Sequence, residues 1–297
     1  MRSSDAWASF SSDIMAVSSA VLCMVFVAIA VFAPLIASQD PFDPGALNLI
    51  DAFQPPMWLE GGSASYVLGT DDQGRDLMSA MFYGLRTSLL VGFAAVLFAV
   101  LVGVPIGLLS GYLGGRVDSL LMRIADIQLS FPGILIALIV DGFARSMLPP
   151  QVHGELAVYV LIVAIGLSKW VPFARTVRGC TMTEKEREYV QAAALLGRHP
   201  LFTMTRHILP NVIGPVLVLF TINLAVAILN EATLSFLGVG MPPTQPSLGT
   251  LIYTGQKFLM SGEWWMVCFP GAVLAALILA VNVLGDWLRD AFNPRLH

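Results

Sequence analysis

Charged residues are scarce in this sequence. Asp, Glu, Lys and Arg make up only 12% of its 297 residues, about half of the share that is usual in soluble domains, whereas 56% of the residues are hydrophobic. This composition argues against a soluble domain and predicts an integral membrane protein. Because a chain embedded in lipid needs no soluble core, we expect a single membrane domain. We expect membrane lipid, and no nucleic acid, among its partners.

Motifs for covalent chemistry are also missing. The sequence has no Gly-x-x-x-x-Gly-Lys-Ser/Thr phosphate loop, no His-Glu-x-x-His and no Gly-x-Ser-x-Gly. Its histidines show no ligand spacing, and its three cysteines are too scattered for a disulfide framework or a metal site. These residues are His153, His199, His207, His297, Cys23, Cys180 and Cys268. We therefore expect no enzyme activity, no cofactor and no metal in this chain.

Long apolar stretches dominate what is present. Six of them approach or exceed the length of about 20 residues that a bilayer requires. They are residues 14–37, 89–109, 119–143, 156–178, 212–234 and 266–284. The first could instead be a signal peptide, since Ala28-Ile29-Ala30 has the form of a cleavage site. However, the apolar run continues past these alanines, so an uncleaved span is favoured.

The longest polar interval, residues 38–86, is rich in proline and glycine. It predicts an extramembrane segment with little regular structure. It contains Leu-Gly-Thr-Asp-Asp-Gln-Gly-Arg-Asp at 68–76, in which Thr70 and Asp71 can cap a following helix and Arg75 can pair with Asp76. A nucleotide site is excluded because no lysine follows the glycines. The candidate functional residues here are Gly69, Thr70, Asp71, Gly74, Arg75 and Asp76.

A second polar interruption, residues 183–210, predicts a bent segment that we call the elbow. Thr183 followed by Glu186 has the form of a capping box, which predicts a helix start. Gly197 predicts the end of that helix. Pro200 begins a second short helix, expected over 201–209 and closed by Pro210.

The first elbow helix is expected to have one largely apolar face and one polar face. Helical spacing places Tyr189, Ala192, Ala193 and Leu196 together, and leaves the polar residues for water or a partner. Those polar residues are Glu184, Arg187, Glu188, Gln191 and Arg198. The same pattern also fits an amphipathic connector that packs against the chain's own membrane helices.

The elbow resembles the Glu-Ala-Ala, Gly and Ile-x-Leu-Pro signature of the permease subunits of bacterial ABC importers. The matching pieces are Gln191-Ala192-Ala193, Gly197 and Ile208-Leu209-Pro210. Gln191 stands where glutamate is usual, and no residue intervenes between Ile208 and Leu209. In that family this cytoplasmic loop docks into a cleft of the ATPase subunit. The resemblance implies ATPase-coupling roles for Glu188, Tyr189, Gln191, Ala192, Ala193, Leu196, Gly197, Arg198 and Pro210.

The segment 68–90 resembles one subfamily, the dipeptide and oligopeptide permeases with their nickel and glutathione relatives. Ala80 departs from it, because arginine is common at that place. Further along, Glu231 is followed at family spacing by Leu-Ser-Phe-Leu-Gly and a proline pair, whereas Leu248 replaces the usual tryptophan. Asn230 and Glu231 are candidate pathway or gate residues, although an acid near a span end can equally cap the next turn.

The cations predict the orientation. Eleven of the sixteen Lys and Arg residues fall on the side that holds the N-terminus, the turn 110–118, the elbow and the C-terminus, and four fall on the other side. Since cytoplasmic loops carry the excess of cations, the elbow and both termini are expected in the cytoplasm of a bacterial inner-membrane protein.

Taken together, these observations predict an all-α membrane protein with six transmembrane helices and a cytoplasmic coupling elbow. We divide it into an N-terminal segment with the first helix and outer loop (1–86), a five-helix core (87–290) containing the coupling loop 183–210, and a cytoplasmic tail (291–297).

The resemblance implies a permease subunit of an ATP-driven importer for di- or oligopeptides. Glutathione and a nickel chelate are alternative cargoes. It also implies as partners a second permease, one or two ATPase subunits that carry ATP and Mg, and an extracytoplasmic solute-binding protein. A stand-alone secondary transporter or channel is a further alternative, although we detect neither an internal repeat nor a charged relay.

Overall fold

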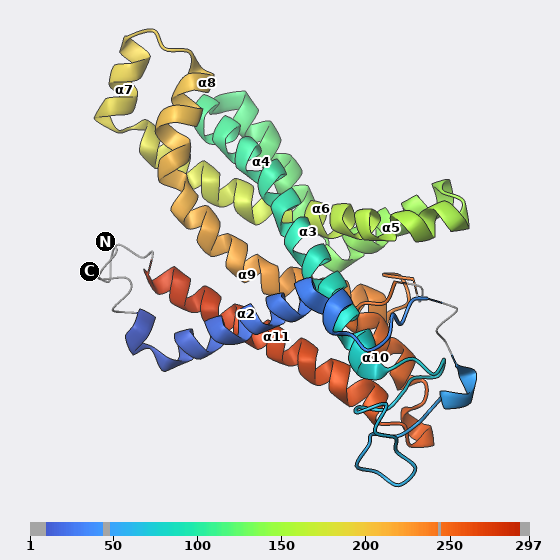
Figure 1. Cartoon of the computed structure of the whole chain (residues 1–297). Coiled ribbons are helices and arrows are strands. Elements are labelled where there is room, and N and C mark those ends of the chain that lie inside the picture. The colour runs from blue at the N-terminus through green and yellow to red at the C-terminus, as the bar shows by residue number, and fades with distance from the viewer. Residues whose placement is uncertain (1–9, 44–47, 243–244, 292–297) are drawn as a thin grey trace.

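The structure is a computed structural model that describes residues 10–43, 48–242 and 245–291. Over these residues the regular elements are helices, which cross one another as long rods (Figure 1). The α-helices are α2 (Ile14–Ile36), α3 (Leu77–Leu113), α4 (Gly115–Leu129), α5 (Gly133–Met147), α6 (Pro150–Lys185), α7 (Glu188–Leu195), α8 (Pro200–Thr203), α9 (Leu209–Phe236), α10 (Leu248–Gln256) and α11 (Trp265–Ala291). Short 3-10 turns, η2 (Leu49–Asp51) and η4 (Leu259–Ser261), lie in the loops, and a π-helical turn, η3 (Met204–Ile208), joins α8 to α9.

Five helical runs among the described residues are long and apolar enough to cross a membrane. They are α2, α3, most of α6, the continuous run Pro200–Phe236 and α11. The sixth predicted span, residues 119–143, is not one straight helix, because α4 and α5 meet at an angle of 91°. Pro132 explains the break, since it lacks an N–H and disfavours the helical conformation of the residue before it. Counted as one broken span, this pair gives the expected six.

Helix boundaries follow capping groups more than hydropathy. Asp13 caps α2 through its carboxylate, so the first span begins where the apolar run predicts. In contrast, Asp76 caps α3 and starts this helix a dozen residues before the apolar stretch that predicted it. The last part of the outer interval, expected to be irregular, is therefore helical. Helix α10 was not anticipated by the sequence; Ser247 and Thr250 form its capping box.

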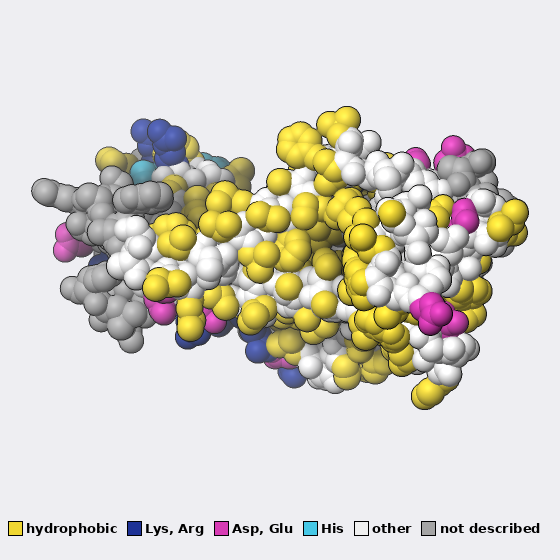
Figure 2. All heavy atoms as spheres, turned by 60° about the horizontal axis from the view of Figure 1, so that its bottom comes forward, with side chains coloured by type: hydrophobic (Ala, Val, Ile, Leu, Met, Phe, Trp, Pro, Cys, Tyr) yellow, Lys and Arg dark blue, Asp and Glu magenta, His cyan; other side chains and the backbone are white. Residues whose placement is uncertain are grey.

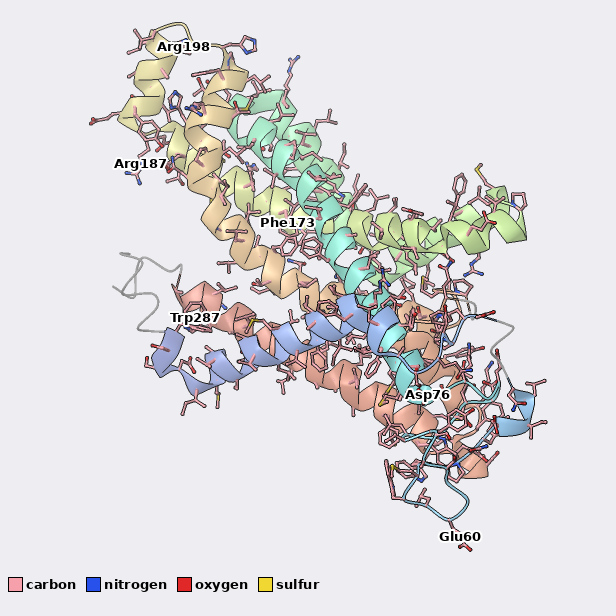
Figure 3. The ribbon with its side chains drawn as sticks, in the orientation of Figure 1. Glu60, Asp76, Phe173, Arg187, Arg198 and Trp287 are labelled. Atoms are coloured by element: carbon pink, nitrogen blue, oxygen red, sulfur yellow. The ribbon has the colours of Figure 1, made fainter. Side chains whose placement is uncertain are left out.

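The centre of the fold is the pairing of α3 with α6. Gly103, Gly107 and Gly111 form a stripe along α3, and a Cβ atom at these positions would lie 2.5, 2.5 and 2.7 Å from backbone oxygens of α6. Those oxygens belong to Trp170, Ala174 and Arg178. The two backbones therefore touch, which is how small residues favour helix association in lipid. Phe173, fully buried and labelled in Figure 3, fills the space beside this contact.

The remaining spans pack around a second apolar cluster. It joins α2, α3, α9 and α11 through buried residues such as Phe26, Leu85, Ile228 and Leu277. Near the start of the described chain, the Phe10 ring contacts Trp287 of α11 edge-on at 4.9 Å. Figure 2 shows the consequence for the surface, since hydrophobic side chains cover much of the visible middle of the molecule.

The two polar intervals lie at opposite ends of the molecule. In Figure 1, α7 and α8 of the elbow form one tip, whereas α10 and the loops before α3 lie at the other end. The turn between α3 and α4 lies near the elbow end. This arrangement agrees with alternate crossing of a membrane by successive spans.

The glycine stripe of α3 allows a test of the helix pairing. We expect Gly107→Ala to destabilise the protein by about 1–3 kcal/mol, because the added methyl group meets the carbonyl oxygen of Ala174. Gly214→Ala in α9 is the matched control, since nothing lies within 4 Å of a Cβ there. That change should be neutral or stabilising by up to about 1 kcal/mol. Thermal unfolding in detergent measures both, and equal midpoints would contradict the close approach.

Candidate functional site

The elbow begins differently from the sequence prediction. Helix α6 continues to Lys185, so Thr183 lies inside it and its hydroxyl donates to the Gly179 carbonyl at 3.2 Å. The predicted capping box with Glu186 is therefore wrong. A short break at Glu186 and Arg187 separates α6 from α7, which begins at Glu188. The competing hydrogen bond within the helix explains the error, since Thr hydroxyls can bond the carbonyl four residues back as readily as they cap.

The tip of the elbow confirms the predicted helix stop at Gly197. This residue has φ +70°, and the Arg198 N–H donates to the Ala193 carbonyl at 3.2 Å, as in a Schellman motif. Apart from its neighbours in the chain, no atom of the described residues lies within 4 Å of a Cβ placed at Gly197. The requirement for glycine here is thus its backbone conformation and not space. Pro200 starts α8 as predicted.

Pro210 does not close the second elbow helix, which corrects the prediction for 201–209. The chain passes through the π-helical turn η3 into α9 without a break. In η3 the Leu209 N–H donates to the Met204 carbonyl, five residues back. This wider turn accommodates a proline ring that would clash with the carbonyl four residues back in a regular α-helix. The elbow is therefore continuous with the membrane helix α9.

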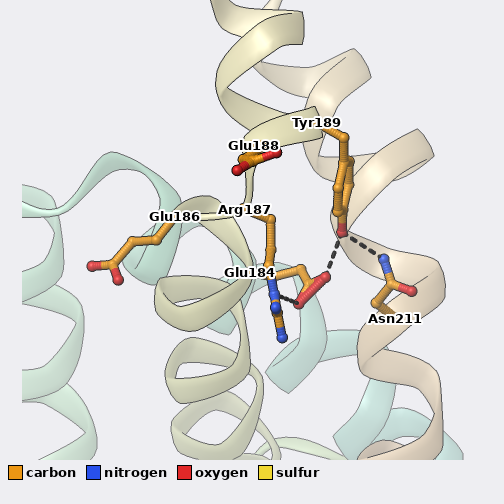
Figure 4. Close-up of a pocket in the computed structure, with 6 residues that line it drawn as sticks. All are labelled: Glu184, Glu186, Arg187, Glu188, Tyr189 and Asn211. Carbon is orange, nitrogen blue, oxygen red and sulfur yellow. Dashed lines mark hydrogen bonds and ion pairs between the residues drawn. The ribbon is translucent and has the colours of Figure 1, made fainter.

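The Tyr189 hydroxyl ties the two sides of the elbow together. It donates to the Glu184 carboxylate at the end of α6 and accepts a hydrogen bond from the Asn211 amide of α9 at 2.9 Å. Figure 4 shows this bridge in an open hollow, with Glu186 pointing away from it. Partial burial, and then the Glu184 carboxylate, raise the pKa of Tyr189 above its usual value. The hydroxyl consequently stays protonated and can act as both donor and acceptor.

Helix α7 buries a different side from the one expected. Val190 and Ala193 are buried, at 2% and 7% exposure, whereas Ala192 and Leu196 are exposed. The group that helical spacing placed together is therefore divided, with Ala193 on the buried side and Ala192 and Leu196 on the exposed side. Exposed apolar side chains form the tip instead: Leu195, Leu196, Leu201 and Phe202. The guanidinium of Arg198 lies over the Phe202 ring at 5.3 Å, and Figure 3 shows Arg198 at this extremity.

Ion pairs and hydrogen bonds anchor the elbow end of α6 to α3 and α4. Two of the three nitrogens of the Arg178 side chain, Nε and Nη2, donate to the Asp118 carboxylate of α4 at 2.5 and 2.6 Å. The Lys185 ammonium donates to the Tyr112 carbonyl at the end of α3 at 2.6 Å. Since α3 and α6 already touch along their backbones, a displacement of the elbow must move both helices.

At the opposite end of the molecule, the segment 68–76, which we call the outer motif, is held by a network of largely buried hydrogen bonds. Gly69 and Gly74 have φ of +84° and +74°, and a Cβ at either would clash with a backbone oxygen. Thr70 does not cap a helix as predicted. Its hydroxyl accepts from the Gln54 N–H at 2.8 Å and donates to the Asp51 carbonyl at 2.5 Å.

Two predicted pairings in this motif are corrected. Arg75 pairs with Asp71, with Nε 2.5 Å from the carboxylate and both side chains buried, and not with Asp76. Asp76 is itself the cap of α3, because its carboxylate accepts from the Ser79 N–H at 3.0 Å and from the Ser38 hydroxyl at 2.9 Å. Asp71 is thus not the helix cap. Burial, and then the neighbouring Asp71 carboxylate, raise the pKa of the adjacent Asp72.

Glu231 is fully buried within this chain. Its carboxylate accepts from the Ser88 hydroxyl of α3 at 2.7 Å and from the Ser235 hydroxyl at 2.8 Å. The Ser88 oxygen accepts in turn from the Leu248 N–H at the start of α10. Glu231 therefore joins α3, α9 and α10, whereas Asn230 beside it is partly exposed.

Sequence reasoning missed the partners of these residues. Asn211, which bridges to Tyr189, directly follows Pro210 in the elbow signature, and Ser88 lies in the family segment 68–90. Both residues therefore lie in or beside the recognised motifs. Their pairing could not be predicted, because Asn211 is 22 residues from Tyr189 and Ser88 is 143 residues from Glu231.

This geometry, a bundle of long apolar helices with a protruding elbow, is that of a polytopic membrane protein. Residues 103–297 match the family described as binding-protein-dependent transport system inner membrane component. Residues 2–56 match the N-terminal TM domain of oligopeptide transport permease C. The chain belongs to this family of inner-membrane transport components, and it is a permease subunit of an ABC importer, not a catalytic subunit.

Individual relatives match over almost the whole chain. It is 38% identical to the dipeptide transport system permease protein DppC of Haemophilus influenzae, over 98% of this chain and 94% of that protein. It is 36% identical to the di/tripeptide transport system permease protein DppC of Pseudomonas aeruginosa, over 98% and 91%. Identity to the oligopeptide transport system permease protein OppC of Bacillus subtilis is 34%, over 99% and 90%.

A solved structure shares the fold. A chain of the inward-facing MetNI methionine ABC transporter superposes with a TM-score of 0.56 at 19% identity. The superposition covers 72% of this chain and 96% of that chain. The expected all-α membrane fold of an importer permease is thereby confirmed.

The Tyr189 bridge predicts how firmly the elbow is held. Tyr189→Phe keeps the ring but removes both hydrogen bonds, each worth about 1 kcal/mol. We expect amide exchange in residues 186–200 to become roughly tenfold faster, because local opening costs less. Tyr159→Phe is the control, on an exposed side chain of α6. Unchanged exchange in the elbow of the Tyr189 variant would show that the bridge does not stabilise it.

The burial of Glu231 predicts a structural cost when it is removed. Glu231→Ala leaves the Ser88 and Ser235 hydroxyls without their acceptor and should lower stability by roughly 1–3 kcal/mol. Asn230→Ala, one residue away and partly exposed, should change stability much less. Unfolding midpoints of the two purified variants provide the measurement. A larger loss for the Asn230 variant would refute the hub role of Glu231.

Proposed function

We propose that this chain is the permease subunit of an ATP-driven importer of di- or oligopeptides, and that the elbow receives the force generated by separate ATPase subunits. The observation that carries the coupling role is the attachment of the elbow. Tyr189 of the elbow is hydrogen-bonded to Glu184 of α6 and to Asn211 of α9. Both helices belong to runs long and apolar enough to cross the membrane. The apolar side chains at the tip of the elbow are exposed, and exposed apolar patches of this kind mark sites of contact with a protein partner.

The peptide class is supported by the relatives. Permeases named for dipeptides, di- and tripeptides or oligopeptides match this chain over nearly its full length. None of these three relatives is named for glutathione or a nickel chelate, the alternative cargoes, so we favour peptides.

The energy must come from other chains, because this sequence has no phosphate loop. In our proposal, ATP and Mg are bound by one or two ATPase subunits that dock at Glu188, Tyr189, Gln191, Ala192, Ala193, Leu196, Gly197, Arg198 and Pro210. Of these, Gln191, Ala192, Leu196 and Arg198 are exposed and available for contact, whereas Ala193 is buried. Closure of the ATPases would push the elbow and rock the attached spans between inward-open and outward-open forms.

The distribution of cations supports a cytoplasmic elbow, with both termini on the same side. A solute-binding protein would then meet the opposite end, where residues 38–43, residues 48–76 and α10 lie. The outer motif and Glu231 hold that end together, so in this proposal they form a firm platform for the binding protein. A second permease would complete the path.

The conformation of Gly197 provides the test. Gly197→Val should uncouple ATP hydrolysis from uptake, since a β-branched residue strongly disfavours φ +70° and the tip of the elbow must rearrange. We expect uptake by the reconstituted importer to fall at least tenfold while ATP hydrolysis continues. Gly197→Asn is the control, because asparagine tolerates this region and should retain most uptake.

Two results would count against the proposal. Normal uptake by the Gly197→Val variant would remove the coupling role of the tip. Purification of the complete system without any ATPase subunit bound to this chain would favour a stand-alone transporter instead.

A further inference from the structure

An open hollow lies beside the outer half of α3. It measures about 460 Å³, within the range of roughly 300–1,000 Å³ that is usual for small-molecule sites. Its wall includes Tyr83, Arg86 and Thr87 from α3, Phe42 from the outer loop and Gln245 from the segment before α10. With Val158 of α6, which also lines it, four separate parts of the chain converge on this hollow.

Arg86 is the charged group of this hollow. It is the only charged residue in α3, and it begins a helical stripe of exposed apolar residues that continues along the span: Leu90, Phe93, Leu97 and Leu101. No ion pair joins Arg86 to an acid within residues 10–43, 48–242 and 245–291. A cation on a membrane helix typically faces a water-filled cavity or a substrate path, since lipid disfavours its charge.

The other groups leave this charge available. Asp40 lies close enough to Tyr83 to act on it electrostatically, as Arg86 does, but its carboxylate accepts a hydrogen bond from the Phe42 N–H at 3.0 Å and forms no ion pair with Arg86. The Thr87 hydroxyl donates a hydrogen bond to the Tyr83 carbonyl at 3.2 Å. The Phe42 and Tyr83 rings meet edge-on at 5.2 Å and form an apolar wall.

The chemistry of this hollow is that of a carboxylate site with an apolar side. An arginine fork binds a carboxylate through two parallel hydrogen bonds, and such charge-assisted bonds are about twice as strong as neutral ones. The aromatic wall offers apolar contact to the atoms attached to that carboxylate. A peptide's C-terminal residue has both features.

We propose that Arg86 binds the C-terminal carboxylate of the transported peptide in the outer part of the translocation path. This inference rests on the proposed function of the chain as a peptide permease. It assigns to Arg86 a contact with the cargo that is separate from the elbow and from the outer motif.

The test compares two forms of one peptide in the complete importer reconstituted in vesicles. The peptide has either a free C-terminal carboxylate or a C-terminal amide, and is chosen so that the binding protein binds both forms and is saturated with each. Arg86→Gln should lower uptake of the free acid roughly tenfold and leave uptake of the amide nearly unchanged. Arg86→Lys, which keeps the charge without the fork, should give a smaller loss for the free acid only.

Lys257→Gln is the matched control. Lys257 is also an exposed cation of the outer end, but it lies over the Tyr253 ring and not in this hollow. This variant should transport both peptide forms like the unmodified importer. Retained uptake of the amide by Arg86→Gln shows in the same experiment that the variant folds and assembles.

Several results would overturn the inference. If Arg86→Gln lowers uptake of the acid and the amide equally, or lowers uptake of neither, Arg86 does not bind the carboxylate. If replacing phosphatidylglycerol by phosphatidylcholine in the vesicles abolishes the effect of Arg86→Gln, the ligand of Arg86 is an anionic lipid headgroup. If the unmodified importer takes up neither peptide form, the proposed peptide function itself fails, which is distinct from failure at Arg86 alone.

Discussion

The contact between the backbones of α3 and α6 is the constraint on which the rest of the structure depends. In lipid, apolar side chains gain little by leaving their surroundings, so two helices associate through close packing and hydrogen bonds. The glycines of α3 bring its backbone against the carbonyl oxygens of α6 over more than two helical turns. The glycines themselves contribute no side chain at these points, and the Cβ atoms of Phe173, Val177 and Thr181 in α6 also lie against them. The two helices are therefore packed at close range along these turns.

The elbow takes its mechanical character from that pair. At its α6 end, Arg178 and Lys185 bind Asp118 and the Tyr112 carbonyl, so the elbow is fastened to α3 and α4 as well as to α6. At its other end it runs through the π-helical turn into α9. Tyr189 closes the loop between these ends. The elbow is thus connected to several spans, as the proposed coupling role requires.

The opposite end is built on a different principle. There the chain contains long irregular segments, whose backbone groups must be satisfied without helical hydrogen bonds. Two buried carboxylates contribute to this, because Asp71 accepts from the Gln73 and Arg75 N–H groups and Asp76 accepts from the Ser79 N–H. Glu231 instead binds two serine hydroxyls. These carboxylates are thus committed to the fold at the outer motif. Among the described residues, no ion pair joins Arg86 to an acid, and it lies outside this network.

The sequence by itself determined the membrane class, the position of most spans, the family and the glycine stop at the tip of the elbow. These depend on local properties, because about 20 apolar residues form a helix in lipid whatever surrounds them, and a positive φ favours glycine at its own position. Only the tertiary structure decided the bend between α4 and α5, the passage through Pro210, the exposed side of α7 and the partners of Arg75, Tyr189 and Glu231. Each of those features depends on which of several competing polar or packing partners is brought within reach, and the distance along the chain does not specify that choice.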